Sequence, residues 1–146
     1  MTTMKHYKSN LRDIYFNLFE FWKIQANVLG TAPYTSIDED TARDVLSGFC
    51  TFCEEEIAPS FAEGDRNPLT LSDDGDVTLP AAIKEALSKY FEAQWYLIDQ
   101  PESLGGYGAP KVLQWSCFEF LVGANPAVSF YLLGNFMGKL IDDLGT

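Results

Sequence analysis

Apolar residues near the start of the chain recur at intervals of three and four positions, which is the spacing of one face of an α-helix. The pattern covers about residues 10 to 28, and its apolar positions are Leu11, Ile14, Tyr15, Leu18, Phe19 and Trp22. Asn10 can cap the first turn, and Asp13 places a negative charge where the helix dipole favours one. We expect Gly30 and Pro33 to close this helix.

A second amphipathic helix is predicted from about Asp38 to Phe61, and acidic residues crowd its start. Its apolar face consists of Ala42, Val45, Leu46, Phe49, Phe52, Cys53 and Ile57. Because proline removes a backbone donor and clashes with the preceding turn, Pro59 predicts a kink or a stop near the end of this helix.

Three more helices are predicted, at about residues 80–96, 110–122 and 126–144. The helix at 110–122 is apolar on most sides, so we expect it to lie at the centre of the molecule. Gly134 and Gly138 are four positions apart in the last helix, which should let another backbone approach closely. The chain is therefore predicted to be all-α, an orthogonal or up-and-down bundle of about five helices.

Turn-forming residues separate these helices. Asp73-Asp74-Gly75-Asp76 followed by Val77-Thr78-Leu79 predicts a small hairpin excursion between the second and third helices. Residues 120–138 lack a charged side chain over 19 positions, which is close to the roughly 20 residues of a membrane span. The break at Gly123-Ala124-Asn125-Pro126 favours two buried helices around a turn instead of a membrane span.

The composition of the chain excludes some partners. Its 146 residues suit one domain, and 47% of them are hydrophobic, which is enough to form a core. The net charge of −11, without any cluster of Lys and Arg, makes nucleic acid a poor partner. The same deficit argues against this segment gripping the phosphates of a nucleotide or of coenzyme A by itself. The polar Met1–Lys8 segment shows no secretory signal, and three cysteines favour a reducing compartment.

Residues with chemical potential are few. Cys50 and Cys53 form a C-x-x-C inside the second helix, where a structural pair is favoured over a redox or zinc site. His6, the only histidine, lies in the polar N-terminal tail and is expected to be inert. Glu119 stands in the most apolar helix, so we expect it to be buried, in a structural hydrogen bond rather than a catalytic role. The stripe Phe130, Leu133, Phe136 and Met137 favours plain core on periodicity alone.

The glycine-rich loop carries a resemblance to a known family. On spacing alone, Leu104–Gly108 is a tight turn and not a phosphate cradle. Pro101-Glu102-Ser103-Leu104-Gly105-Gly106-Tyr107-Gly108 nevertheless resembles the Pro-Glu-x-x-Gly-Gly-x-Gly turn of acyl-CoA dehydrogenases, and Glu119 matches a Glu in the helix after it. Glu56-Ile57-Ala58-Pro59 and Gly64-Asp65-Arg66 continue the likeness. Tyr7–Ile14 is similar to the N-terminal extension of the larger subgroup.

The resemblance implies a domain organisation. Residues 1–34 would form the extension helix, and residues 35–146 would form the N-terminal helical domain of the family. Family members continue into a β-domain and a second helical domain, which hold most flavin contacts and the catalytic base. The chain is therefore expected to be truncated before the β-domain. It would contain no catalytic residue, and alone it would neither hold FAD firmly nor turn over.

The resemblance also implies an activity. Family members remove the α-proton of an acyl-CoA with a carboxylate and pass the β-hydrogen to FAD as hydride, and their electrons leave through an electron-transferring flavoprotein. By position, Ser129, Phe130, Leu133 and Met137 match the family's acyl-chain wall, with Tyr131 adjacent. The full-length protein is expected to be a homo-oligomer in the cytoplasm, or in the mitochondrial matrix if the source is eukaryotic.

Two other hypotheses fit the same residues. The chain could be a free-standing helical interaction module, in which the stripe of the last helix docks a partner helix. It could also be a stand-alone protein with a small-molecule pocket and no chemistry. The reading frame after Thr146 discriminates these hypotheses: continuation into a β-rich segment supports the enzyme, and a stop codon favours the module.

Overall fold

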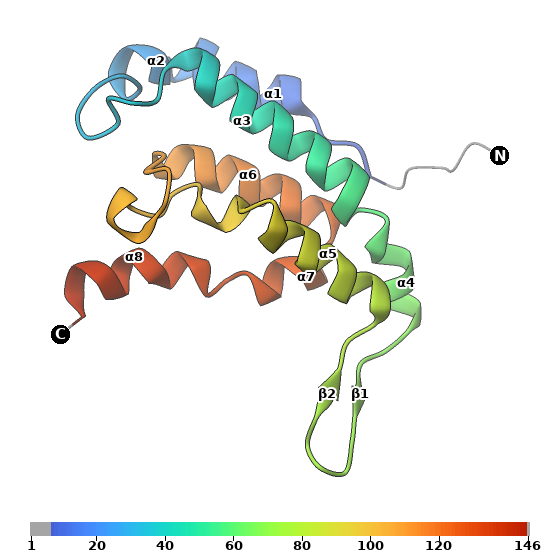
Figure 1. Cartoon of the computed structure of the whole chain (residues 1–146). Coiled ribbons are helices and arrows are strands. Elements are labelled where there is room, and N and C mark those ends of the chain that lie inside the picture. The colour runs from blue at the N-terminus through green and yellow to red at the C-terminus, as the bar shows by residue number, and fades with distance from the viewer. Residues whose placement is uncertain (1–6, 146) are drawn as a thin grey trace.

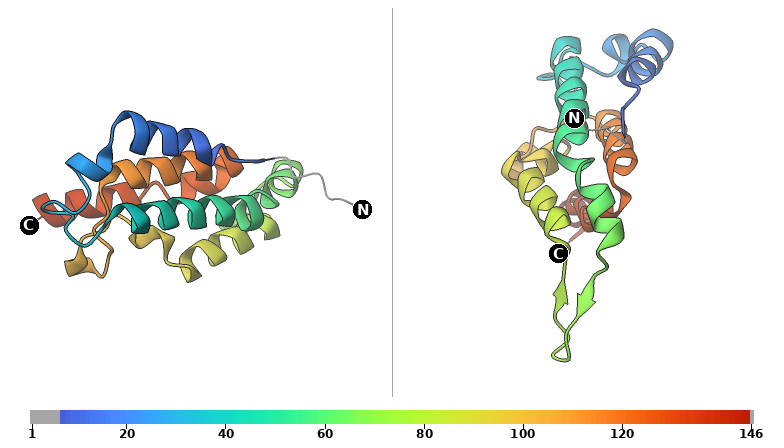
Figure 2. Two further views of the ribbon diagram at one scale, coloured as in Figure 1. Left: turned by 90° about the horizontal axis from the view of Figure 1, so that it is seen from above. Right: turned by 90° about the vertical axis from the view of Figure 1, so that its right-hand side faces the viewer.

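The computed structural model describes residues 7–145, which form a bundle of helices in three layers (Figure 1). The upper layer contains α1 (Leu11–Tyr15), α2 (Ile24–Asn27) and α3 (Glu39–Phe52). The middle layer contains α5 (Ala81–Glu92) and α6 (Lys111–Ala124), and the lower layer contains α7 (Pro126–Tyr131) and α8 (Asn135–Leu144). The right-hand view of Figure 2 shows the same layering from one end of the bundle. The prediction of an all-α bundle is confirmed.

The core lies around α6, because this helix is covered by α3 on one side and by α7 on the other. Its innermost side chains are those of Leu113, Cys117, Phe120 and Leu121, and α3 adds Ala42, Leu46 and Phe49. These positions agree with the apolar face predicted for the second helix. The central position predicted for the helix at 110–122 is also confirmed.

Side-chain caps set the starts of the first two helical segments. The Asn10 side chain accepts a hydrogen bond from the Asp13 amide at 3.3 Å, as predicted. The Asp38 side chain does the same for the Thr41 amide at 2.8 Å. The second segment runs through α3 and the π-helical η2 (Cys53–Ile57) and stops before Pro59, where α4 (Ser60–Arg66) begins. A stop at Pro59 was one of the two predicted outcomes.

The first helical segment differs from the single helix predicted for residues 10–28. After α1 the chain continues as the π-helix η1 (Phe16–Phe21) and then breaks at Lys23, whose φ of 52° lies in the left-handed region. The Gln25 side chain donates to the Phe19 carbonyl at 3.0 Å and satisfies one acceptor at this break. Lysine does not favour the left-handed conformation, so the sequence pattern did not predict this break.

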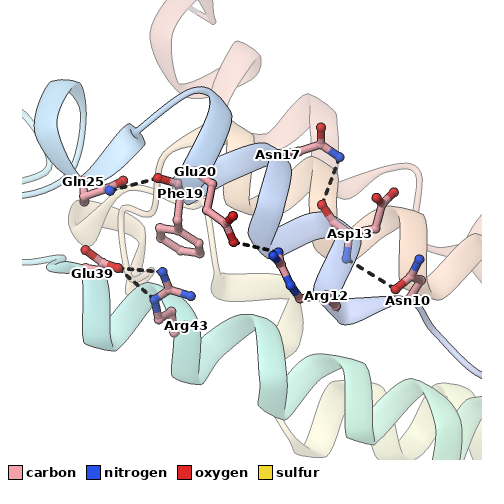
Figure 3. A network of polar contacts seen from close by, with 9 residues as sticks. All are labelled: Asn10, Arg12, Asp13, Asn17, Phe19, Glu20, Gln25, Glu39 and Arg43. Atoms are coloured by element: carbon pink, nitrogen blue, oxygen red, sulfur yellow. Dashed lines mark hydrogen bonds and ion pairs between the residues drawn. The ribbon is translucent and has the colours of Figure 1, made fainter.

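Arg43 holds the first segment against α3 (Figure 3). Its guanidinium donates to Glu39 Oε1 from Nε at 2.9 Å and from Nη2 at 2.6 Å. The same group lies 3.9 Å from the Phe19 ring centroid and 4.9 Å from that of Tyr15. Arg12 and Glu20, also drawn in Figure 3, form an ion pair at 2.7 Å that stays largely exposed to solvent.

A hairpin separates α4 from α5. Strands β1 (Thr70–Leu71) and β2 (Val77–Thr78) pair antiparallel, with Leu71 opposite Val77. The turn is closed by the Gly75 amide, which donates to the Ser72 carbonyl at 3.0 Å, and Gly75 has a φ of 87° that glycine tolerates. The predicted hairpin excursion is therefore confirmed.

The helix predicted at residues 80–96 ends earlier, at Glu92. Gln94 adopts a φ of 58°, and the chain then forms the short 3₁₀ turns η3 (Trp95–Leu97) and η4 (Glu102–Leu104) before α6. As at Lys23, a side chain without turn preference takes the left-handed conformation, so the stop was missed.

The helix predicted at residues 126–144 is two helices. The chain turns at residues 132–134 between α7 and α8, and Leu132 is buried there. The Phe136 amide donates to the Leu133 carbonyl and the Met137 amide to that of Gly134, which starts α8 in a new direction. The expected close approach at the two glycines is also corrected: Gly134 faces open space, and Gly138 lies against the Gln100 side chain rather than a backbone. No helix of the described residues is long and apolar enough to cross a membrane.

Arg43→Ala should lower the free energy of unfolding by about 1–2 kcal/mol, because it removes two ring contacts and an ion pair. Arg12→Ala is the matched control, and its loss should stay within about 0.5 kcal/mol because its ion pair is exposed. Urea unfolding followed by circular dichroism gives both values. Equal losses for the two variants would show that Arg43 does not hold the first segment in place.

Candidate functional site

Helix α7 is fixed to the rest of the molecule by a buried polar cluster at its start. The Asn125 side chain accepts from the Ala127 amide at 3.0 Å, and its amide group donates to Ser60 Oγ at 2.8 Å. Ser60 Oγ donates in turn to the Ile57 carbonyl at 2.6 Å. Because Asn125 is 1% exposed, this chain of hydrogen bonds sets the direction of α7 without competition from water.

Helix α8 is fixed by one aromatic side chain. The Phe136 ring stacks on Trp115 at a centroid distance of 4.9 Å and meets Phe118 edge-on at 4.9 Å. Both partners belong to α6, so Phe136 attaches α8 to the central helix. Phe136 is half-buried and faces α6, whereas Phe130, Leu133 and Met137 are exposed, so the expectation of plain core is wrong for these three residues.

The outer side of α7 and α8 is an apolar surface. Met137, Leu140, Ile141 and Leu144 recur at the spacing of one helix face, and Phe130 and Leu133 continue the row toward α7. We call these six residues the α7–α8 face. All six are exposed, from 41% at Leu133 to 74% at Leu144. Large exposed apolar side chains that gather on consecutive elements mark a candidate binding or docking site.

The residues expected at the acyl-chain wall divide into two groups. Phe130, Leu133 and Met137 lie on the α7–α8 face and are not enclosed by neighbouring helices, and Tyr131 beside them is also exposed. Ser129 is buried at 4% exposure, and its hydroxyl donates to the Pro126 carbonyl at 2.7 Å. Ser129 thus supports the helix from within and does not present its hydroxyl to the face. The assignment of these residues to an acyl chain stays a prediction.

Glu119 corrects one expectation. Although it stands between two phenylalanines, its side chain is exposed on the outside of α6. The expected burial of Glu119 is therefore wrong. The error has a simple cause, because α6 is apolar on most sides but still has one face toward solvent. His6 lies outside the described residues.

The cysteines are inert in this fold. Cys50, Cys53 and Cys117 are all buried and free. Burial in apolar surroundings raises the pKa of the Cys53 and Cys117 thiols well above the ordinary value, with smaller contributions from the neighbouring thiols. Neither thiol can supply the thiolate that a nucleophile or metal ligand needs. Within the described residues, no group of His, Cys, Asp and Glu could hold a metal ion.

The glycine loop does not fit a phosphate group. The amides of Gly105, Gly106 and Gly108 donate to backbone carbonyls within 3.0 Å, and so do those of Tyr107 and Ala109. A side chain at Gly106 would collide with the Gln100 carbonyl, since an added Cβ would lie 2.0 Å from it. These hydrogen bonds hold the loop against the preceding turn. None of these donors remains for the diphosphate of FAD.

A groove between the start of α3 and the glycine loop was not predicted from the sequence. Its volume is about 530 Å³, and it is lined by Ser36, Ile37, Thr41, Val45, Ala93, Gln94, Trp95, Ile98, Glu102, Gly106, Tyr107 and Ala109. The lining residues come from two distant regions of the chain, residues 36–45 and 93–109, so their spacing carries no signal. This groove is where a small-molecule pocket without chemistry would lie.

Comparison with known proteins identifies homologues of the chain. No protein-family model matches the chain. It is 40% identical over 144 residues to the broad-specificity linear acyl-CoA dehydrogenase FadE5 of Mycobacterium tuberculosis. The chain is homologous to the N-terminal part of acyl-CoA dehydrogenases. This statement confirms the resemblance drawn from the glycine loop and the helices around it.

A second relative supports the same homology. The chain is 33% identical over 138 residues to 3-methylmercaptopropionyl-CoA dehydrogenase of Ruegeria pomeroyi. These alignments cover 98% and 94% of the chain but 23% of each relative. The chain thus spans about a quarter of the length of the acyl-CoA dehydrogenases that it matches. The names of both relatives specify acyl-CoA substrates, linear ones in the first case.

The free energy of unfolding should fall as pH rises above 9, the ordinary pKa of a cysteine thiol. Folding raises the pKa of Cys53 and Cys117, so the folded chain keeps protons that the unfolded chain loses, and the stabilisation is complete only below that pH. Each thiol should contribute up to about 1.4 kcal/mol per pH unit. Urea unfolding between pH 7 and 10 measures this slope.

The double variant Cys53→Ala/Cys117→Ala is the control for this measurement. It will be less stable at every pH, because alanine is smaller than cysteine and each substitution leaves a small cavity in the core. Its stability should nevertheless fall less steeply above pH 9 than that of the parent chain. Identical slopes would contradict the assignment of the alkaline loss to these two thiols.

Proposed function

We propose that the chain is the N-terminal helical part of a flavin-dependent acyl-CoA dehydrogenase, and that its α7–α8 face forms one wall of the acyl pocket. The proposal rests on one observation above all. A chain homologous to these enzymes over nearly its whole length exposes a row of six large apolar side chains on its last two helices. Such a surface matches the tail of a fatty acyl thioester in chemistry.

The proposed task of this segment is positioning. Phe130, Leu133 and Met137 would contact the acyl chain and keep water from it, while the rest of the enzyme supplies the base. The polar cluster at Asn125 and the Phe136 contact would hold these side chains in place. Large side chains at Phe130 and Met137 would shorten or bend the tunnel, so they are the residues expected to set chain-length preference.

FAD would be held mainly by the rest of the full-length protein. The amides of the glycine loop are already used, and the segment carries a net charge of −11, so neither feature suits a diphosphate. Residues 1–34 would form the N-terminal extension and residues 35–146 the helical domain. Electron-transferring flavoprotein would be the electron acceptor, and the full-length protein would be a homo-oligomer in the cytoplasm, or in the mitochondrial matrix of a eukaryote.

The complete gene product should bind FAD and lose its flavin absorbance when mixed with acyl-CoA thioesters. The isolated 146-residue chain should do neither, because the groups that hold FAD are proposed to lie in the rest of the protein. The measurement is a visible spectrum before and after addition of a panel of acyl-CoAs of different chain length, without oxygen. A reading frame that stops after Thr146, or a complete product without flavin, would instead favour the interaction module.

Phe130→Ala in the complete protein should change chain-length selectivity, because it removes a large side chain from the proposed wall. We expect kcat/KM for longer acyl-CoAs to rise relative to shorter ones by about tenfold, the lower end of the scale for one methylene group in a hydrophobic pocket. Phe21→Ala is the matched control, since Phe21 is similarly exposed but lies in the N-terminal segment. Unchanged selectivity in Phe130→Ala would count against the proposed wall.

A further inference from the structure

Residues 67–79, here called the arm, stand clear of the helical bundle (Figures 1 and 2). Residues 67–78 are all exposed, including both strands of the hairpin. The arm leaves the bundle between α4 and α5, which pack closely together. An added Cβ at Gly64 would lie 2.7 Å from Ile83 Cδ1, so this glycine permits the close packing at the base of the arm. The arm is therefore an extended projection on a firm base.

The arm lacks the interactions that keep a hairpin folded in water. Each strand has two paired residues, and a two-stranded ribbon is marginally stable unless it packs against something. Leu69, Leu71 and Val77 are more than half exposed, and Leu71 faces Val77 across the ribbon. Both strands also leave a free edge of backbone donors and acceptors. A surface that covered these groups would stabilise the arm.

The charge of the arm narrows the chemistry of that surface. Asp73, Asp74 and Asp76 stand at the tip, and residues 67–79 contain no Lys or Arg. The arm thus carries a charge of −3. A second copy of the chain would bring the same negative charge and be repelled. A complementary surface would offer an apolar slot bordered by Lys or Arg.

We propose that the arm docks onto the part of the full-length protein that follows residue 146, in an apolar slot bordered by basic side chains. This inference rests on the proposed function, which makes the chain the first part of a longer protein. The relatives are about four times as long as the chain, so ample surface exists for such a slot. The arm then joins the helical domain to the rest of the enzyme, away from the α7–α8 face.

Hydrogen exchange tests the docking directly. Peptides covering residues 67–79 are followed by mass spectrometry in the isolated chain and in the complete gene product. The arm should exchange at the rate of an unstructured peptide in the isolated chain, and at least tenfold more slowly in the complete protein. Equal rates would overturn the proposal. Protection that disappears on dilution would overturn it as well, because the partner would then be a second copy.

A charge variant tests the chemistry of the slot. Asp73→Asn/Asp74→Asn/Asp76→Asn in the complete protein should speed exchange of the arm at least threefold, and the difference should shrink as salt is added. The matched control is Asp13→Asn/Asp44→Asn/Glu119→Gln, which removes three exposed charges elsewhere and should leave exchange of the arm unchanged. A salt-independent result, or the same effect in both variants, would contradict a basic border.

These measurements separate the two proposals. A protected arm in a protein that neither binds FAD nor reacts with acyl-CoAs supports the docking and removes the proposed activity. An active flavoprotein with an unprotected arm does the reverse. A reading frame that ends after residue 146 removes both, because the surface proposed to receive the arm would not exist.

Discussion

The burial of α6 between α3 and α7 is the interaction on which the rest of the structure depends. Leu113, Cys117 and Leu121 of α6 are almost completely removed from water, and each such side chain contributes about 1.5–3 kcal/mol when it is buried. Because α6 is apolar on most sides, it needs cover on more than one side. Helices α3 and α7 cover α6 from above and below. The outer faces of these covering layers stay accessible for other contacts.

The outer face of the lower layer is where function follows from packing. Asn125 and Phe136 use buried contacts to fix α7 and α8 on the core side, which leaves Phe130, Leu133 and Met137 directed away from it. Helices α7 and α8 pack against the bundle on one side and expose apolar side chains on the other. The exposed side is suited to contact another apolar surface. In an acyl-CoA dehydrogenase, the proposed occupant of the other side is the substrate tail and the domains around it.

Much of this fold could be predicted from the sequence, because periodicity and caps are local signals. Asn10 capped as expected, Pro59 ended its helix, and the Asp-rich turn gave a hairpin. The breaks at Lys23 and Gln94 could not be predicted, because neither residue prefers the left-handed backbone that tertiary packing imposes on it. The turn at 132–134 was missed for a related reason, since an unbroken apolar pattern hid a change of direction that buries Leu132.

The candidate site was predictable in part. Homologous positions pointed to Ser129, Phe130, Leu133 and Met137, but periodicity could not tell which of them face outward. The structure puts Ser129 inside and the other three outside. Glu119 was predicted to be buried and is exposed, because apolar neighbours in the sequence do not by themselves place a residue in the core. The groove beside the glycine loop gave no sequence signal, since residues 36–45 and 93–109 are far apart in the chain and meet to form it.

In the assembled enzyme, the α7–α8 face is proposed to contact the acyl chain. The most direct measurement is photolabelling of the complete protein with an acyl-CoA that carries a diazirine at the far end of its chain, followed by peptide mapping. Label is expected on residues 126–144, and its amount should fall when an unmodified acyl-CoA competes. Label confined to other parts of the protein would contradict it.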